Sequence, residues 1–327
     1  MSEFQKPRVL ISKCIEFDYC RWNGNIIRSP FIKILKHYVD FIPVCPEVEI
    51  GLGVPRDPVR LVLDKVELRM MQPASNKDFT NSMNTFADNF LSSISEVDGF
   101  ILKSKSPSCG LFNTKYYQAT TKGAPKLQEG PGLFGKKAVE MFPNKAIETE
   151  GRLTNFRIRE HWLIKLFILA DWRNLKSSRS THELVKFHTK NKFVFMAYNQ
   201  NIMRELGKIV ANPEKLDFND LAHKYELKLL DLLRIPPEYT AHINVLMHAL
   251  GYFKKILNHD EKSFFLDELD KYRTGWIPLF VLQNLLNSWI IRFDEKYLRK
   301  QTYFNPYPEE LMNFDLLDTW RGRSYWI

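Results

Sequence analysis

Apolar runs that end close to cysteines are the feature that most constrains the fold of this chain. The runs and the cysteines that follow them are residues 9–11 with Cys14, residues 41–44 with Cys45, and residues 99–102 with Cys109. Short apolar runs bounded by polar and turn-forming residues are typical of buried β-strands. Because neighbouring parallel strands end at one edge of an open α/β sheet, where ligands bind, we expect these cysteines to share a site.

The residues between these runs show helical spacing of apolar side chains. Strands that alternate with helices predict an α/β domain with a mostly parallel sheet. The expected strands are residues 8–12, 40–44 and 99–102, and the expected helices are residues 30–38 and 78–95. Residues 123–135, rich in glycine and proline, predict a surface loop near the cysteines. A short helix over residues 135–142 and a last strand over residues 143–147 complete this domain.

The pattern changes in the second half of the chain. From residue 154 onward, long amphipathic segments with few strand signals indicate an all-α helical bundle. We therefore expect two domains, residues 1–150 and residues 151–327. The expected helices of the second domain are residues 156–175, 181–210, 216–233, 237–258, 261–274 and 278–296.

The cysteines indicate metal chemistry. No apolar run is long enough to cross a bilayer and the N-terminus lacks the apolar core of a secretory signal, so we expect a cytoplasmic protein without a membrane partner. In a reducing compartment disulfides are rare, which favours metal binding or catalysis, although any single cysteine can be a small buried hydrophobe. Close pairs such as those of zinc ribbons are absent from the sequence. Three thiolates would leave one iron of a [4Fe-4S] cluster open for chemistry, whereas a fourth, from Cys20, would close it.

The charge balance indicates an anionic partner. The formal net charge is +9 and the sequence pI is near 9.2. Nucleic acid is the first candidate for such a partner, and a soluble protein that is merely basic is the alternative.

The residues around the cysteines resemble three motifs of the thiouracil desulfidase family, in the order expected for that family. The matching segments are residues 11–14 with 20–24, residues 45–48 with 51–52 and 55–58, and residues 106–110. This resemblance covers about residues 7–147. Residues 155–312 resemble a helical domain of unknown function that is often fused behind the desulfidase domain, although Tyr198 stands where that family tends to have a histidine.

The resemblance implies an oxygen-sensitive [4Fe-4S] cluster held by Cys14, Cys45 and Cys109, with Cys20 outside the ligand set. In the family the free iron takes sulfur from a thiocarbonyl base, and water replaces it. Glu47 matches the family's acidic residue beside the second ligand. Ser106 or Ser108 matches its second catalytic group, with Ser104 as a further option. As structural alternatives, Glu47 can cap a loop or pair with Arg56, and the serines can form turns.

The fusion of the two domains is similar to enzymes that remove sulfur from 4-thiouridine in transfer RNA. The basic residues that we expect to contact substrate are Lys105, Arg21 and Arg56 near the motifs, and His188 and Lys192 in the helical half. A solvated basic face and a structural histidine are the alternatives for these positions. We therefore expect a [4Fe-4S]-dependent desulfidase of 4-thiouridine in tRNA. The alternatives are a desulfidase of free thiouracil or thionucleotides and a non-catalytic nucleic-acid-binding protein with a structural metal.

Overall fold

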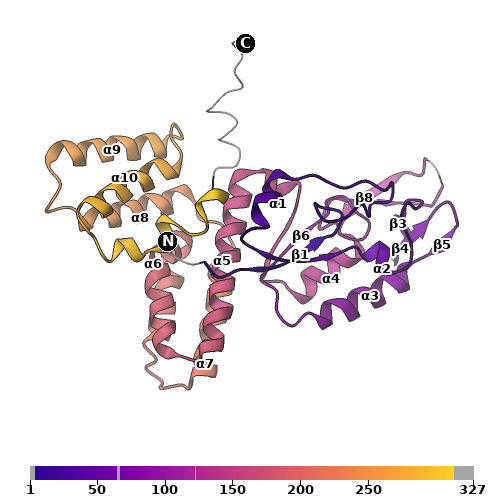
Figure 1. Ribbon diagram of the computed structural model, residues 1–327, viewed down its shortest axis with the longest axis horizontal. Coiled ribbons are helices and arrows are strands. Elements are labelled where there is room, and N and C mark those ends of the chain that lie inside the picture. Colours follow the sequence, from indigo (N-terminus) through magenta and orange to yellow (C-terminus); the bar gives the residue numbers. More distant parts are fainter. Residues whose placement is uncertain (1–3, 65–66, 122, 313–327) are drawn as a thin grey trace, which may run out of the picture. The chain divides into compact units, whose positions relative to one another are not determined.

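The computed structural model describes residues 4–64, 67–121 and 123–312, so residues 313–327 of the second expected domain lie outside the described residues. The chain divides into an α/β unit, Met1–Ala170 with Pro308–Ile327, and a helical unit, Asp171–Tyr307 (Figure 1). Among the described residues, no helix combines the length and the apolar character needed to span a membrane.

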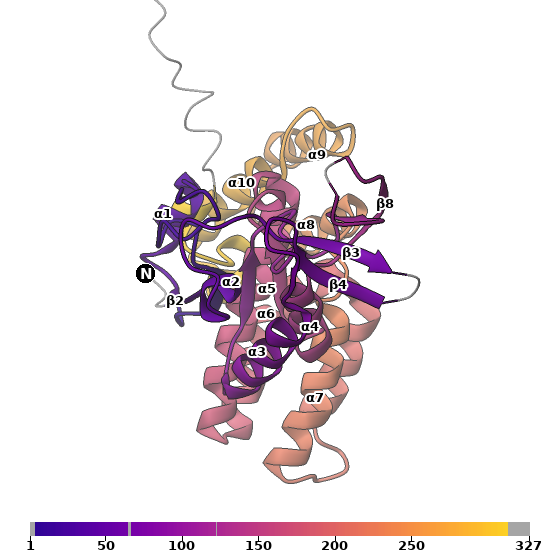
Figure 2. The ribbon, with the colours of Figure 1, turned by 90° about the vertical axis from the view of Figure 1, so that its right-hand side faces the viewer.

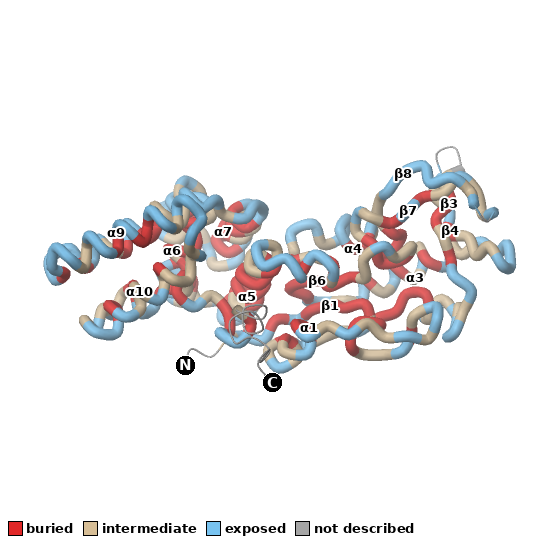
Figure 3. The backbone as a smooth tube through the Cα atoms, turned by 90° about the horizontal axis from the view of Figure 1, so that it is seen from above, coloured by how far each residue is buried: buried red, intermediate tan, exposed pale blue. Residues whose placement is uncertain are grey.

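A parallel sheet of four strands forms the first layer of the α/β unit. Its order is β2 (Asp40–Val44), β1 (Arg8–Ser12), β6 (Gly99–Leu102) and β9 (Ala146–Thr149). All three pairings in this sheet are parallel, and the side chains of β6 and most of β1 are buried (Figure 3). The expected strands over residues 8–12, 40–44 and 99–102 are confirmed. The continuous apolar runs of β1 and β6 fit strands that are covered on both faces, whereas β2 lies at the edge of the sheet and is mostly half-buried or exposed.

A second sheet of five strands was not expected from the sequence. Its order is β5 (Lys77–Asp78), β4 (Glu67–Gln72), β3 (Arg60–Asp64), β7 (Thr114–Tyr117) and β8 (Lys126–Gly130). Every pairing except that of β3 with β7 is antiparallel. Strand β8 lies within the surface loop predicted for residues 123–135, so that prediction is wrong in this part. Its side chains are mostly exposed, and without apolar alternation the strand depends on backbone pairing with β7.

Short helices complete the α/β unit. These are α1 (Pro30–Leu35), α2 (Pro46–Glu49), α3 (Thr80–Ser93) and α4 (Leu133–Met141). On α3 the buried side chains recur at four-residue spacing, at Met83, Ala87 and Leu91, and they share a hydrophobic core with Phe134 and Ala138 of α4. The short helix expected over residues 135–142 is therefore present, shifted towards the N-terminus.

Long helices follow, as expected for the second half of the chain. They are α5 (Phe156–Ser178), α6 (Thr181–Val210), α7 (Phe218–Leu232), α8 (Tyr239–Tyr252), α9 (His259–Arg273) and α10 (Leu279–Arg292). The division between the units falls within α5, after Ala170. In the helical unit α6 packs against α7 (Figure 2), and rings of Trp172, Phe187 and Tyr225 meet at their contact. Short 3₁₀ turns are η1 (Arg152–Thr154), η2 (Leu298–Lys300), η3 (Thr302–Phe304) and η4 (Glu309–Leu311).

Candidate active site

The cysteines follow the carboxyl ends of three adjacent strands of the parallel sheet. Cys14 follows β1, Cys45 follows β2 directly, and Cys109 lies in the loop after β6. Since β2, β1 and β6 are neighbours and run parallel, these segments begin at the same edge of the sheet. All four cysteines of the chain are buried and free.

The cysteine thiols form a connected group. The Cys20 thiol hydrogen-bonds with the thiols of Cys14 and Cys45, and the Cys45 Sγ also donates to the Cys20 carbonyl oxygen at 3.8 Å. Cys109 lies close enough to Cys45 for their charges to interact. The structure thus brings together the three expected cluster ligands, and it places Cys20 among them.

The surroundings of Cys20, Cys45 and Cys109 raise the pKa values of their thiols. The hydrogen bond with Cys14 is the main reason that the pKa of Cys20 rises to about 11. The hydrogen bond with Cys20, followed by burial, raises the pKa of Cys45 far above its usual range. Burial raises the pKa of Cys109 to about 12, although a hydrogen bond with Ser12 partly opposes it. The thiols of Cys20, Cys45 and Cys109 are therefore protonated at neutral pH, and binding to a cation would release their protons.

Glu47 joins two of the cysteine-bearing segments. It lies on α2, which begins directly after Cys45, and it is 8% exposed. The Glu47 Oε2 accepts hydrogen bonds from Arg56 Nε at 2.9 Å and Arg56 Nη2 at 2.6 Å, and Glu47 Oε1 accepts one from Ser108 Oγ at 2.5 Å. The ion pair with Arg56 that we considered as a structural alternative is therefore present, and the same carboxylate also contacts the serine beside Cys109.

The three candidate serines have different partners. Ser106 Oγ lies 3.1 Å from Ser108 Oγ and accepts a hydrogen bond from the Cys109 backbone N–H at 3.1 Å. Ser104 instead donates its N–H and its hydroxyl to the carboxylate of Glu150, both at 2.8 Å. Of the three serines, Ser108 alone contacts Glu47 among the described residues.

The loop that carries Cys109 docks onto the N-terminal end of α4. The Gly132 N–H donates to the Gly110 carbonyl oxygen at 2.7 Å, and the Gly135 N–H donates to the Ser108 carbonyl oxygen at 2.9 Å. A Cβ atom on Gly135 would lie 2.3 Å from the Gly110 carbonyl oxygen, so only glycine permits this approach. The glycines near residue 132 thus fix the loop that holds Ser108 and Cys109.

Two families match successive parts of the chain. Residues 9–150 match 2-thiouracil desulfurase, and residues 192–308 match a family described as a protein of unknown function, DUF1722. The uncharacterized protein YbgA of Escherichia coli (strain K12) is 30% identical over 154 residues, which is 46% of this chain and 91% of YbgA. The chain belongs to the same family as YbgA, and it contains a 2-thiouracil desulfurase domain followed by a DUF1722 domain. The resemblance seen in the sequence, including the helical domain fused behind the first, is confirmed.

Two further relatives were found for this desulfurase-family chain. The uncharacterized protein YbbK of Bacillus subtilis (strain 168) is 30% identical over 109 residues, which is 31% of this chain and 72% of YbbK. Among solved structures, the [4Fe-4S]-dependent thiouracil desulfidase TudS matches with a TM-score of 0.36 and 22% identity, over 46% of this chain and 94% of TudS.

Ser12 lies within the first motif segment, residues 11–14, but we expected no role for it at the site. Ser12 is 2% exposed, and its Oγ accepts a hydrogen bond from the Lys103 N–H at 2.9 Å. Its hydroxyl therefore has its proton free for the Cys109 thiol, with which it hydrogen-bonds. The signal in the sequence was a serine at the end of an otherwise apolar strand.

The expected basic residues of the desulfurase-family chain lie in different places. Arg56 contacts Glu47 directly, and its Nη1 also donates to the carbonyl oxygens of Cys20 and Gly53 at 3.0 and 2.9 Å. Lys105 and Arg21 belong to the segments that carry Cys109 and Cys20, whereas His188 and Lys192 lie on α6 of the helical unit.

The donor set of the desulfurase-family site suits iron. Four buried thiols are soft donors, which iron and zinc both accept. Within the part of the chain that the structure describes, no three His, Cys, Asp or Glu side chains gather closely enough to hold a single metal ion. A [4Fe-4S] cluster takes one thiolate on each ligated iron, and Cys14, Cys45 and Cys109 offer such thiols from three separate segments at one edge of the sheet.

Proposed function

We propose that this chain is a [4Fe-4S]-dependent desulfidase that replaces the sulfur of a thiolated uracil with oxygen. Cys14, Cys45 and Cys109 are the cluster ligands in this proposal. The observation that carries it is the hydrogen bond between Ser108 and Glu47, which puts a carboxylate and a hydroxyl beside two of the three ligands. The match to the 2-thiouracil desulfurase family supports the class of substrate.

When bound, the cluster would supply an iron without a cysteine ligand, which is a soft Lewis acid suited to sulfur. Glu47 acts as the general base and takes a proton from water while the water oxygen bonds to the thiocarbonyl carbon. The carbon–sulfur bond then breaks, and the two protons of the water leave with the sulfur as hydrogen sulfide, one of them by way of Glu47. The thiocarbonyl thereby becomes a carbonyl, with no net oxidation or reduction.

Arg56 and Ser108 position the base in this scheme. Arg56 binds one carboxylate oxygen of Glu47 with two N–H groups, and Ser108 binds the other, so the carboxylate has a fixed orientation. Ser108 can turn its hydroxyl towards a substrate oxygen when substrate enters, and it can keep its contact with Ser106, whose Oγ lies 3.1 Å from the Ser108 Oγ. We therefore assign Ser108, before Ser106, as the second catalytic group.

For the substrate, we propose 4-thiouridine in tRNA before free thiouracil or a thionucleotide. A formal net charge of +9 supports a polyanionic substrate, because phosphate contacts with basic residues dominate affinity for nucleic acids. The helical unit behind the desulfurase-family unit offers further basic surface, including Lys192.

The contact of Cys20 with Cys14 and Cys45 favours a second candidate function. Four cysteines would close a metal centre and leave no open iron, which suits a non-catalytic nucleic-acid-binding protein with a structural metal. We place Cys20 outside the ligand set. The two candidates therefore predict different metal contents when Cys20 is replaced, because only the structural metal centre would lose a ligand.

The test of the proposed function is an anaerobic incubation with two substrates in parallel. The reconstituted protein is mixed with tRNA that contains 4-thiouridine and, separately, with free 2-thiouracil, and nucleosides and released sulfide are measured. Loss of 4-thiouridine from tRNA with an equal amount of sulfide is the expected result. If only free thiouracil is converted, the substrate is the small molecule and not tRNA. A protein that carries its cluster and converts neither would overturn the proposal.

A further inference from the structure

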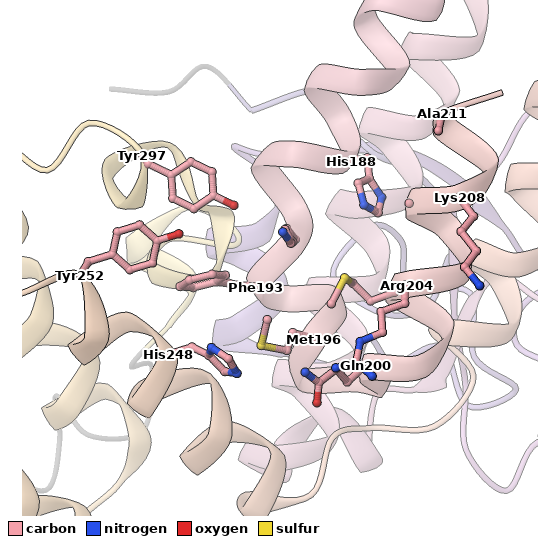
Figure 4. Close-up of a pocket in the computed structure, with 13 residues that line it drawn as sticks. His188, Phe193, Met196, Gln200, Arg204, Lys208, Ala211, His248, Tyr252 and Tyr297 are labelled. Carbon is pink, nitrogen blue, oxygen red and sulfur yellow. The ribbon is translucent and has the colours of Figure 1, made fainter. Parts of the chain in front are cut away.

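The helical unit contains a pocket of about 550 Å³ that the desulfidase chemistry does not use (Figure 4). Pockets of about 300–1,000 Å³ accommodate small organic ligands. Its walls come from α6, from α8 and from Tyr297, which precedes η2. All of these residues belong to the unit Asp171–Tyr307.

A break in α6 shapes the pocket. Asn199 has φ −162° and ψ 109°, which are not helical values, and its Oδ1 accepts hydrogen bonds from the N–H groups of Asn201 and Ile202. The side chain thus caps a second helical segment, in the manner of an ordinary helix N-cap. Side chains from both segments line the pocket at helical spacing, namely His188, Lys192 and Met196 before the break, and Gln200, Arg204 and Lys208 after it.

The charge that lines the pocket is positive and is not neutralised. Lys192, Arg204 and Lys208 line it, no carboxylate does, and no ion pair joins these three residues to an acidic side chain within the described residues. On the same helix, Lys186 pairs with Glu183 and Lys190 pairs with Asp171, each at 2.7 Å. Unlike Lys186 and Lys190, the three cations that line the pocket therefore have no acidic partner among the described residues.

The opposite side of the pocket is aromatic. The rings of Tyr252 and Tyr297 are stacked, with centroids 5.5 Å apart and an interplanar angle of 9°. Phe193 meets both rings edge-on, with centroids 6.3 and 6.2 Å away. Tyr252 is 44% exposed, so a planar ligand can reach this group of rings. Figure 4 shows the two tyrosines together, with Arg204 and Lys208 on the other side.

We propose that this pocket binds a nucleotide, with its base against Tyr252 and its phosphate among Lys192, Arg204 and Lys208. Aromatic rings stack on bases of any sequence, and unpaired lysine and arginine side chains bind phosphate. A ligand with a flat apolar part and an anionic part matches both walls at once. Where the nucleotide belongs to an RNA strand, this inference rests on the proposed tRNA substrate, but the binding site itself does not depend on the cluster.

His188 forms part of the wall and is not one of the phosphate-binding cations. Its Nδ1 lies 3.1 Å from the Tyr225 hydroxyl, and burial lowers its pKa to about 4, so it is neutral at pH 7. The nearby positive charge of Lys192 lowers the pKa further in the same direction. We therefore assign the structural role that we considered for His188, and we keep Lys192 as a ligand contact.

The nucleotide can be an unpaired residue of an RNA strand or a free mononucleotide. The test measures binding of the full chain, without added iron, to a fluorescent single-stranded oligouridylate by anisotropy. Unlabelled UMP and uridine serve as competitors. Unlabelled oligouridylate is a third competitor and sets the reference concentration. If UMP competes at a similar concentration, the ligand is the free nucleotide. If UMP competes much more weakly than the oligonucleotide, the ligand is the RNA strand. Uridine, which lacks the phosphate, should compete at least tenfold more weakly than UMP.

The variants are Tyr252→Ala, Lys192→Gln and Lys208→Gln. Each should weaken oligouridylate binding about tenfold, because one stacked base or one phosphate contact is lost. Tyr252→Phe keeps the ring and should bind like the unchanged protein. The matched controls are Tyr239→Ala and Lys262→Gln, which remove the same groups from the helical unit outside the pocket. Lys208 is exposed, so its variant tests the proposal even if Tyr252→Ala does not fold.

Weaker binding in the pocket variants, with the controls unchanged, supports the proposal. Equal binding by pocket and control variants would overturn it in favour of a diffuse basic surface. An absence of binding to both UMP and oligouridylate would overturn it as well. Because desulfidation is not measured, these outcomes are independent of the proposed function.

Discussion

The hydroxyl of Ser108 donates a hydrogen bond of 2.5 Å to the carboxylate of Glu47, which lies 61 residues earlier in the sequence. This contact joins the helix that follows Cys45 to the loop that holds Cys109. Both residues are buried, with 1% of Ser108 and 8% of Glu47 exposed. The carboxylate that we propose as the general base is therefore joined, through one buried hydrogen bond, to the segments that carry two of the proposed cluster ligands. The contribution of each residue can be tested separately.

Replacing Ser108 with alanine should lower kcat about 10- to 100-fold, because Glu47 loses the partner of one oxygen and the substrate loses a hydroxyl contact. Ser106→Ala is the matched comparison, and it should reduce kcat less, because Ser106 contacts Ser108 and the Cys109 backbone N–H but not Glu47. Steady-state kinetics measure both effects, with kcat normalised to the iron content per chain. A larger loss in Ser106→Ala than in Ser108→Ala would reverse our assignment of the two serines.

Replacing Glu47 with glutamine should lower kcat by about 10²- to 10⁴-fold, the usual contribution of a general base, while iron content stays the same. Glu49→Gln provides the control, since Glu49 lies on the same short helix but is exposed. Single-turnover rates with a loaded cluster separate the chemical step from assembly. If Glu47→Gln retains full activity, Glu47 is a structural partner of Arg56 and not the base.

Arg56→Gln should destabilise the α/β unit by about 3–5 kcal/mol, because removing one partner of a buried ion pair leaves the other charge uncompensated. The side chains of Arg56 and Glu47 are only 4% and 11% exposed. Arg69 and Glu67 form an exposed pair, so Arg69→Gln should change the free energy of unfolding by less than about 1 kcal/mol. Urea unfolding of the three proteins gives the comparison. If the two variants have equal free energies of unfolding, the buried ion pair between Arg56 and Glu47 does not stabilise the α/β unit as predicted.

The buried thiols predict how the stability of the metal-free protein depends on pH. The pKa of Cys109 is about 12 in the folded chain, above the ordinary value of 9.0 that applies after unfolding. The unfolded state therefore loses this proton first as the pH rises, so folding stability should fall between about pH 9 and pH 12 and be unaffected below that range. Urea midpoints across this range measure the slope. Cys109→Ser should reduce this slope without abolishing it, because the pKa values of Cys20 and Cys45 are raised as well. An unchanged slope would show that Cys109 does not contribute.

The parallel sheet and the cysteine positions could be predicted because their signal is local. The apolar runs that become β1, β2 and β6 identify buried strands without any knowledge of their neighbours. By contrast, β5 has only two residues and β8 is largely exposed, so neither carries an apolar pattern. The apolar residues Leu61, Val62 and Leu63 of β3 were the local signal for this sheet. Among the described strands of the sheet, only the pairing of β3 with β7 joins segments that are far apart in sequence.

The same distinction applies to the site. Glu47 and the cysteines stand in short motifs, whereas the hydrogen bond from Ser12 to Cys109 and the docking of Gly132 onto the Cys109 loop join segments that are far apart in sequence. Tyr252 and Tyr297 likewise meet only through the packing of the helical unit. Sequence spacing gave no sign that Cys20 would lie between Cys14 and Cys45, because loop geometry decides that contact.

The most direct test of the central claim is the iron and acid-labile sulfide content of anaerobically reconstituted Cys→Ser variants, read together with visible absorbance. The unchanged protein and Cys20→Ser should each carry about four irons per chain. Substitution of Cys14, Cys45 or Cys109 should abolish most of this iron and the visible band. Loss of iron in Cys20→Ser to the same extent as in the other three would contradict the open-iron account and indicate a closed centre with four cysteine ligands.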